Sequence, residues 1–186
     1  MNSFPTSAFQ PQPGKLGHLV FENPDRGVAP RLELSIDLPF GPFEIDDEEI
    51  STALLLSGIR VQGRSWRDFE NAAADISLAD GQVRLFGSHN PVELTSLTFG
   101  ELSGQTISAK LEFEIDFEME GNDEYGIIPL TLDAKLEIGR LRIATSINKR
   151  LNAEASEIER ELAEIVDFAA YGAMEKAPGG LEYPLA

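Results

Sequence analysis

Apolar and polar residues alternate along most of this chain, which is the period of a β-strand with one buried and one wet face. Over residues 31–38, leucine or isoleucine takes every even position and a polar residue takes every odd one. Residues 16–21 form a weaker strand ahead of it, closed by the turn signal Asn-Pro-Asp at 23–25. The N-terminal third is therefore predicted to be β-structure.

The longest alternating run covers residues 107–120. Its later apolar positions are Leu111, Phe113, Ile115, Phe117 and Met119, and the polar positions between and after them are Glu112, Glu114, Asp116, Glu118 and Glu120. Alternation resumes over residues 130–138 after a loop, so the two runs predict a long antiparallel hairpin. After Ile138 the apolar residues move from even to odd positions, beginning with Leu141. Gly139 lies at this break and predicts a β-bulge or a tight turn.

The middle of the chain leaves more alternatives open. Asp80-Gly81 separates two apolar runs and predicts a two-residue hairpin turn, and residues 87–91 are typical of a turn after a strand. Residues 54–61 are either a buried strand or the end of a helix that begins at Asp46. Ser65 is a candidate cap for a short helix around Trp66.

Near the C-terminus the apolar period becomes helical. Residues 152–176 carry a stripe of Ile158, Leu162, Ile165, Val166, Ala169 and Ala173, which predicts an amphipathic helix about 30 Å long. We expect it to cover one face of a sheet or an open end. Residues 1–15 are predicted as a flexible or surface-tracking arm, and residues 177–186 as a similar tail.

These elements predict a mainly β fold in a single domain over residues 16–176. The expected architecture is an antiparallel β-sandwich or a strongly curved sheet of about 6–8 strands, with one C-terminal amphipathic helix. A chain of 186 residues is long enough to bury a core without disulfides.

The chain is strongly acidic, with a formal net charge of −17 and a pI near 4.4. Such a field repels nucleic acid and anionic membranes and attracts cationic partners, although solubility or life at high salt is an alternative reason for it. There is no cysteine, which excludes disulfides and thiol chemistry and fits a reducing cytosol. No apolar run approaches the length of a membrane span. We expect a soluble cytoplasmic protein that binds neither nucleic acid directly nor membranes.

No catalytic motif emerges from the sequence. His18 and His89 are the only histidines, and the nucleophile-elbow, P-loop and H-E-x-x-H patterns are absent. A strand spreads its carboxylates along a line, and residues 46–49 lack the alternating order of an EF-hand loop, so a calcium site is disfavoured. We therefore expect no enzyme, no cofactor and no metal.

The remaining candidate chemistry is partner binding. The acidic polar positions and the only tryptophan supply the candidate contact residues, which are Glu112, Glu114, Asp116, Glu118, Glu120, Asp46, Asp47, Glu48, Glu49 and Trp66. A solvated sheet face, a helix N-terminus at 46–49 and a buried Trp66 are the structural alternatives. Arg60, Arg64 and Arg67 either hold an anion or pair with nearby carboxylates.

The sequence thus predicts a non-catalytic acidic protein-binding module. Its most concrete version is an inhibitor or immunity-type protein that neutralises a basic partner such as a toxin. Two alternatives stay open: a structural or assembly subunit that forms a homo-oligomer, and a β-barrel small-ligand binder or hydrolase that uses carboxylates. Neither the partner nor the oligomeric state follows from the sequence.

Overall fold

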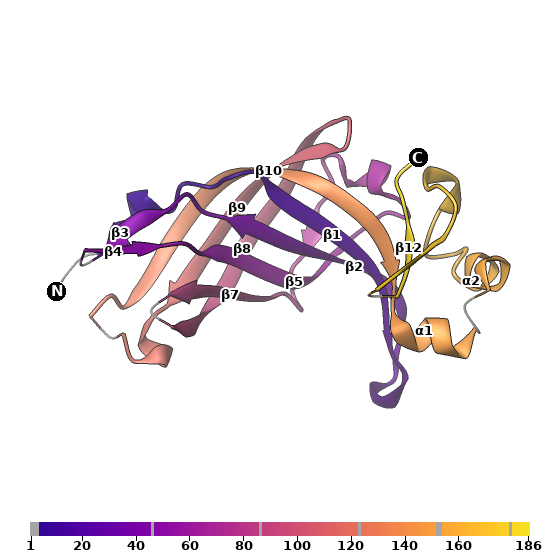
Figure 1. Cartoon of the computed structure of the whole chain (residues 1–186), viewed down its shortest axis with the longest axis horizontal. Helices are drawn as coiled ribbons and strands as arrows, with labels where there is room; N and C mark the ends of the chain where they lie inside the picture. The colour runs from indigo at the N-terminus through magenta and orange to yellow at the C-terminus, as the bar shows by residue number, and fades with distance from the viewer. Residues whose placement is uncertain (1–3, 46, 86, 123, 152–153, 179) are drawn as a thin grey trace.

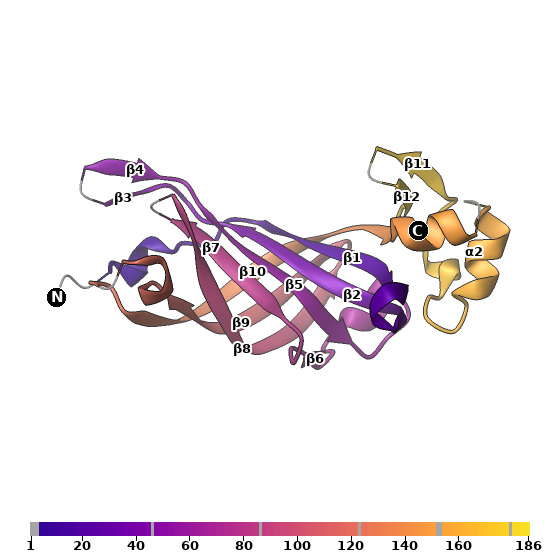
Figure 2. The same ribbon diagram turned by 90° about the horizontal axis from the view of Figure 1, so that it is seen from below.

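The computed structural model describes residues 4–45, 47–85, 87–122, 124–151, 154–178 and 180–186. In these residues the fold is mainly β, with one large sheet and two short α-helices. The sheet is elongated and strongly curved, and both helices lie at one end of it (Figure 1, Figure 2). The curved-sheet alternative of the sequence prediction is therefore the correct one.

The sheet closes on itself. Its wall consists, in order of pairing, of β1 (Gly14–Asn23), β2 (Val28–Pro39), β5 (Ala53–Val61), β7 (Asp80–Leu85), β8 (Ser88–Ser103), β9 (Thr106–Asp116) and β10 (Ile127–Ile143). Neighbours along this order are antiparallel, and β1 also pairs with β10 in parallel, which completes the ring.

Shorter elements extend the ring and join its strands. The remaining strands are β3 (Phe43–Ile45), β4 (Glu48–Ile50), β6 (Ala74–Asp75), β11 (Glu175–Ala177) and β12 (Gly180–Tyr183). The α-helices and 3-10 helices are α1 (Thr145–Arg150), α2 (Ala155–Glu161), η1 (Thr6–Ala8), η2 (Pro24–Arg26), η3 (Trp66–Phe69), η4 (Glu118–Glu120) and η5 (Phe168–Ala170). β3 and β4 form a separate hairpin, β6 pairs with β5, and β12 continues the sheet from β10 to β11.

The alternation seen in the sequence places one side chain in two inside the ring. Leu32, Leu34, Ile36 and Leu38 of β2 are buried as predicted, and β9 and β10 form the predicted hairpin. The predicted bulge at Gly139 is also confirmed, because β1 pairs Leu16 with Ile138 and then His18 with Leu141. One residue of β1 there opposes two of β10, which keeps the apolar residues on the inner face despite the change of parity.

The two chain ends differ from their predictions. Phe4 and Phe9 of the N-terminal arm are buried, and in the tail Leu181 and Tyr183 are buried in β12. Among the described residues of the range 152–176, the expected helix is present only as α2, over seven residues. The backbone N–H of Asp167 donates to the carbonyl of Arg64, at 2.8 Å, instead of continuing the helix. A tertiary contact thus takes a backbone donor that the helix needed.

The prediction of a turn at Asp80-Gly81 is wrong, because both residues lie inside β7. A Cβ on Gly81 would stand 2.6 Å from Cδ2 of Leu56, so this glycine allows close packing of strands rather than a turn. The turn between β7 and β8 contains Gly87, with a φ of 77°, and residues 88–91, predicted as a turn, begin strand β8.

Around residues 46–75 the strand alternative is correct for β5. Residues 47–49 lie in the turn and second strand of the β3–β4 hairpin rather than in a helix, and Asp47 has a φ of 66°. Asp46 falls outside the described residues. The short helix capped by Ser65 is confirmed as η3, where Ser65 and Asp68 form a capping box.

Candidate functional site

Two acidic segments that are far apart in the sequence lie at the same end of the molecule. The β3–β4 hairpin and the connection from β9 to β10 both project at the end where the N-terminus lies (Figure 1, Figure 2). We call this region the acidic end and define it by Glu44, Asp47, Glu48, Glu49, Asp116, Glu118, Glu120 and Glu124.

A chain of aromatic rings holds the two segments together. Phe43 of β3 contacts Phe9, with ring centroids 5.8 Å apart, and Phe9 contacts Phe4 at 5.2 Å. Phe4 in turn stacks on Phe117, beside η4, at 5.0 Å. The buried N-terminal arm therefore fixes the hairpin relative to the β9–β10 connection, and the carboxylates of both are presented together.

The predicted ladder of five carboxylates is interrupted after Asp116. Strand β9 ends there, and the Asp116 Oδ1 accepts the backbone N–H groups of Glu118, at 2.9 Å, and Met119, at 3.1 Å. These bonds start the 3-10 turn η4, which Gly121 ends with a φ of 81°. Glu118 and Glu120 therefore leave the strand and are exposed on the turn.

The three carboxylates that remain on β9 lie on the outer face of the ring. Glu112 pairs with Lys110 at 3.3 Å, and among the described residues it is the only one of the three with an ion pair. Lys135 of β10 lies opposite Ser108 rather than opposite any of these carboxylates. Glu114 lies opposite Glu93 of β8, an acidic neighbour that the sequence analysis did not identify.

Cations are missing from the segments that build the acidic end. No lysine or arginine occurs in residues 1–14, 32–59 or 111–134. Within the part of the chain that the structure describes, none of the ion pairs involves a carboxylate of the acidic end. The region is thus negatively charged without internal compensation.

Two large apolar side chains are exposed beside these carboxylates. Met119 is 73% exposed, and Ile127, directly opposite Asp116, is 53% exposed. Alternation predicted Met119 on the inner face, and this is wrong because η4 turns the chain out of the strand. The signal that η4 would form is the sequence Asp116 to Gly121, whose ends supply the cap and the left-handed residue.

Trp66 is not an exposed anchor in this structure. It is 7% exposed, and its Nε1 donates to the carbonyl of Ala170 at 2.9 Å. Nearby, Arg67 lies over the indole ring, and Arg64 donates to the carbonyl of Ala163. Trp66 therefore belongs to the opposite end of the molecule, where it binds the C-terminal segment.

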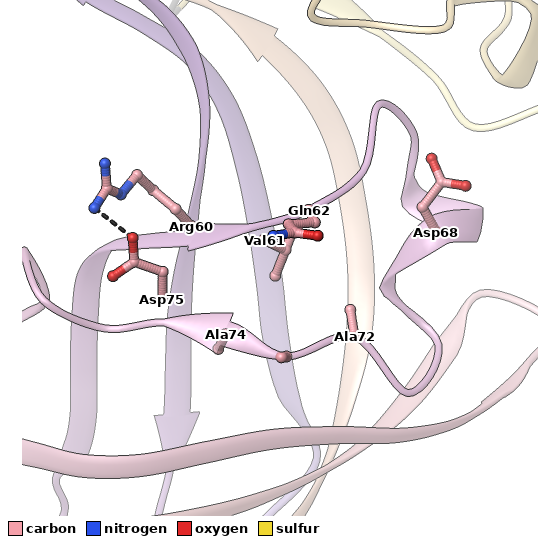
Figure 3. A pocket seen from close by; sticks show the side chains of 8 residues that line it. Arg60, Val61, Gln62, Asp68, Ala72, Ala74 and Asp75 are labelled. Carbon is pink, nitrogen blue, oxygen red and sulfur yellow. Dashed lines mark hydrogen bonds and ion pairs between the residues drawn. The ribbon is translucent and has the colours of Figure 1, made fainter.

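An open pocket of about 520 Å³ lies between the end of β5 and β6 (Figure 3). Arg60 and Asp75 on its rim pair with each other at 2.5 Å. On the other side, Asp68 accepts the backbone N–H of Arg64, which lowers the pKa of this carboxyl. Its charged groups already have partners, and alanines supply much of the remaining lining, so the pocket holds no evident reactive set.

The histidines are likewise separate from the acidic end's carboxylates. His89 contacts Arg84 and Gln82 on the outer face, whereas His18 is buried inside the ring. Over the described ranges, no three His, Cys, Asp or Glu side chains converge where they could hold a metal ion. None of the helices described is long and apolar enough to cross a membrane.

Comparison with known proteins identified no relative of this chain. The chain matches no family model, and neither curated proteins nor solved structures give a significant match. The acidic end itself is therefore the feature that points to a function.

Proposed function

We propose that this protein is a non-catalytic acidic binding module that captures a basic protein partner through its acidic end, in the manner of an inhibitor or immunity-type protein. The observation that carries the proposal is the juxtaposition of uncompensated carboxylates with two exposed apolar side chains, Met119 and Ile127. Charge alone would serve solubility, but large exposed apolar residues beside it are typical of an interface.

The two kinds of side chain have different roles in this mechanism. The carboxylates attract a cationic surface over long range and orient it, which raises the association rate. Met119 and Ile127 then become desolvated against the partner and supply a large part of the affinity. Because the aromatic chain through Phe4 holds the region in place, the surface loses little conformational freedom on binding.

The nature of the partner follows from the same surface. A negative field of this size disfavours nucleic acid, so we propose a protein with a basic patch rather than DNA or RNA. The cysteine-free composition fits the cytoplasm, where we place the encounter.

The experiment is affinity capture from the native host with three forms of the full chain. The wild type is compared with Glu118→Lys/Glu120→Lys, which reverses two exposed carboxylates and leaves the Asp116 cap intact. Glu101→Lys/Glu137→Lys is the matched control, because it makes the same charge change at exposed positions outside the acidic end.

We expect one basic protein to be retained by the wild type and the control and lost with the acidic-end variant. Equal capture by all three forms contradicts the proposal. Light scattering of the purified protein separates the assembly alternative, which requires a stable homo-oligomer of high order.

A further inference from the structure

His18 lies inside the closed sheet, at the end opposite the acidic end. In the sheet, His18 of β1 is paired with Leu34 of β2 on one side and with Leu141 of β10 on the other. The side chain is 1% exposed, and neither ring nitrogen has a hydrogen-bond partner among the described residues. A buried imidazole with two unpaired nitrogens is unusual, because each buried polar atom without a partner destabilises the fold.

Two aromatic rings pack against the imidazole. Phe69, from η3, meets it edge-on with ring centroids 5.8 Å apart, and Tyr171, which follows η5, lies 5.6 Å away. Burial raises the pKa of the Tyr171 hydroxyl, which accepts the backbone N–H of Trp66 at 3.2 Å. His18 is thus enclosed by the wall and by two rings that come from different parts of the chain.

Several charged groups on the surrounding elements have partners other than His18. On β2, Glu33 pairs with Arg31, and on β10, Arg142 pairs with Glu182. Asp68 beside Phe69 caps η3, and Asp167 ahead of Tyr171 accepts the N–H of Ala169. The carboxylate on β1 itself, Glu22, pairs with Arg150. Within the described residues none of these groups bonds to His18, so a protonated ring there has no counter-ion.

The cover over His18 is an interface between two segments, and we call it the end cap. It joins residues 64–69 to residues 163–171 and the C-terminus. Backbone carbonyls accept most of its polar contacts: Arg64 O from Asp167 N, Ala170 O from Trp66 Nε1, and Ala186 O from Arg67 Nη2. These contacts can separate without breaking a pair of strands in the ring.

We propose that His18 is an acid-operated latch: its protonation separates the two sides of the end cap and exposes Trp66 to solvent. The physical reason is that an unpaired charge in an apolar site is energetically unfavourable. This free-energy cost falls once the cap opens and water reaches the ring. This device is independent of the acidic end and regulates access to the opposite end of the closed sheet.

The size and sign of the effect follow from linkage. Burial lowers the pKa of His18 from 6.5 to about 4, so the open state binds more protons than the closed state between these values. The contribution of neutral His18 to the stability of the closed state is complete above pH 6.5, and it is lost as the pH falls toward 4. Opening at pH 5 is expected to be about 30-fold more favourable than at pH 7.5.

Amide hydrogen exchange tests the latch directly. The N–H groups of Trp66 and Asp167 are bonded across the end cap, and the N–H of Phe113 in β9 is the internal control. After correction for intrinsic exchange, protection at Trp66 and Asp167 is expected to fall about 30-fold between pH 7.5 and pH 5, with little change at Phe113. His18→Leu, and His18→Phe as a second variant, should abolish the difference between the two pH values.

The same loss of protection in wild type and variants overturns the latch, and so does unchanged protection in the wild type. A further measurement needs no change at His18. In His89→Gln the only imidazole signal belongs to His18, and we expect its titration midpoint to lie between 4 and 6.5 and to coincide with the loss of protection in the end cap. Titration near 6.5 with the end cap still protected contradicts the proposal. Neither outcome depends on whether the acidic end binds a partner.

Discussion

Glu93 of β8 lies directly opposite Glu114 of β9 on the outer face of the closed sheet. Like charges at directly opposed positions destabilise a pair of strands, by about 0.2–1 kcal/mol. The pair therefore adds negative charge beside the acidic end at a cost in stability.

The first prediction concerns this pair. Glu114→Gln should raise the free energy of unfolding by roughly 0.2–1 kcal/mol at low salt, because it removes the repulsion from Glu93. The gain should shrink at high salt, where exposed charges are screened. Urea unfolding at two salt concentrations measures both effects. Glu137→Gln, which faces Thr106, is the control and should show no such gain; a destabilised Glu114→Gln would contradict this reading.

The second prediction tests the N-terminal arm. Phe4 is 5% exposed and contacts Phe9, Phe117 and Tyr125. Phe4→Ala should therefore cost about 3–5 kcal/mol of stability in denaturant unfolding, as expected for a buried aromatic residue. Leu78→Ala is the comparison, since Leu78 is 51% exposed and its loss should change stability by less than about 0.5 kcal/mol. Similar small effects for both would mean that the arm is not packed.

The third prediction separates a packing glycine from an unconstrained one. A Cβ on Gly81 would meet Leu56 Cδ2 at 2.6 Å and the carbonyl oxygen of Val92 at 3.0 Å. Gly81→Ala should cost about 1–3 kcal/mol through this overpacking. Gly139→Ala meets nothing closer than 3.6 Å and should be tolerated. Thermal unfolding of the two variants decides the matter, and a tolerated Gly81→Ala would contradict the close approach of Leu56 and Val92 to Gly81.

The fourth prediction concerns the capping box of η3. Asp68 accepts the N–H groups of Arg64 and Ser65, at 2.9 Å each, and these bonds lower the pKa of its carboxyl. Asp68→Ala should cost about 0.5–2 kcal/mol at neutral pH. Because the folded-state pKa lies below the unfolded one, this contribution is present above about pH 4 and lost as the pH falls through the folded-state pKa. Unfolding curves of both forms should therefore converge in acid, and a constant difference would contradict the linkage.

Much of the fold could be predicted from the sequence because alternation directly encodes which face of a strand is buried. This holds for β2, for the β9–β10 hairpin and for the bulge at Gly139. The bulge was indicated by the shift of the apolar residues from even to odd positions. The closure of the ring by the parallel pairing of β1 with β10 could not be predicted, since it joins segments distant in the chain.

Two of the errors share one physical cause, which is tertiary contact overriding local preference. Gly81 was assigned to a turn because Asp-Gly favours one, yet the close approach of Leu56 explains the glycine. The helical stripe through Leu162 and Val166 is buried, but the bond from Asp167 to Arg64 redirects the chain. At the candidate site, the carboxylates of β9 were identified, whereas the exposed Met119 depended on the unforeseen turn η4.

The most direct test of the acidic end is the association rate constant of the captured partner as a function of ionic strength. For the wild type and for Glu101→Lys/Glu137→Lys, we predict fast association that slows steeply as salt is added. Glu118→Lys/Glu120→Lys should associate at least about 10-fold more slowly at low salt and show a flatter dependence. An association rate and salt dependence identical to those of the wild type would contradict the account.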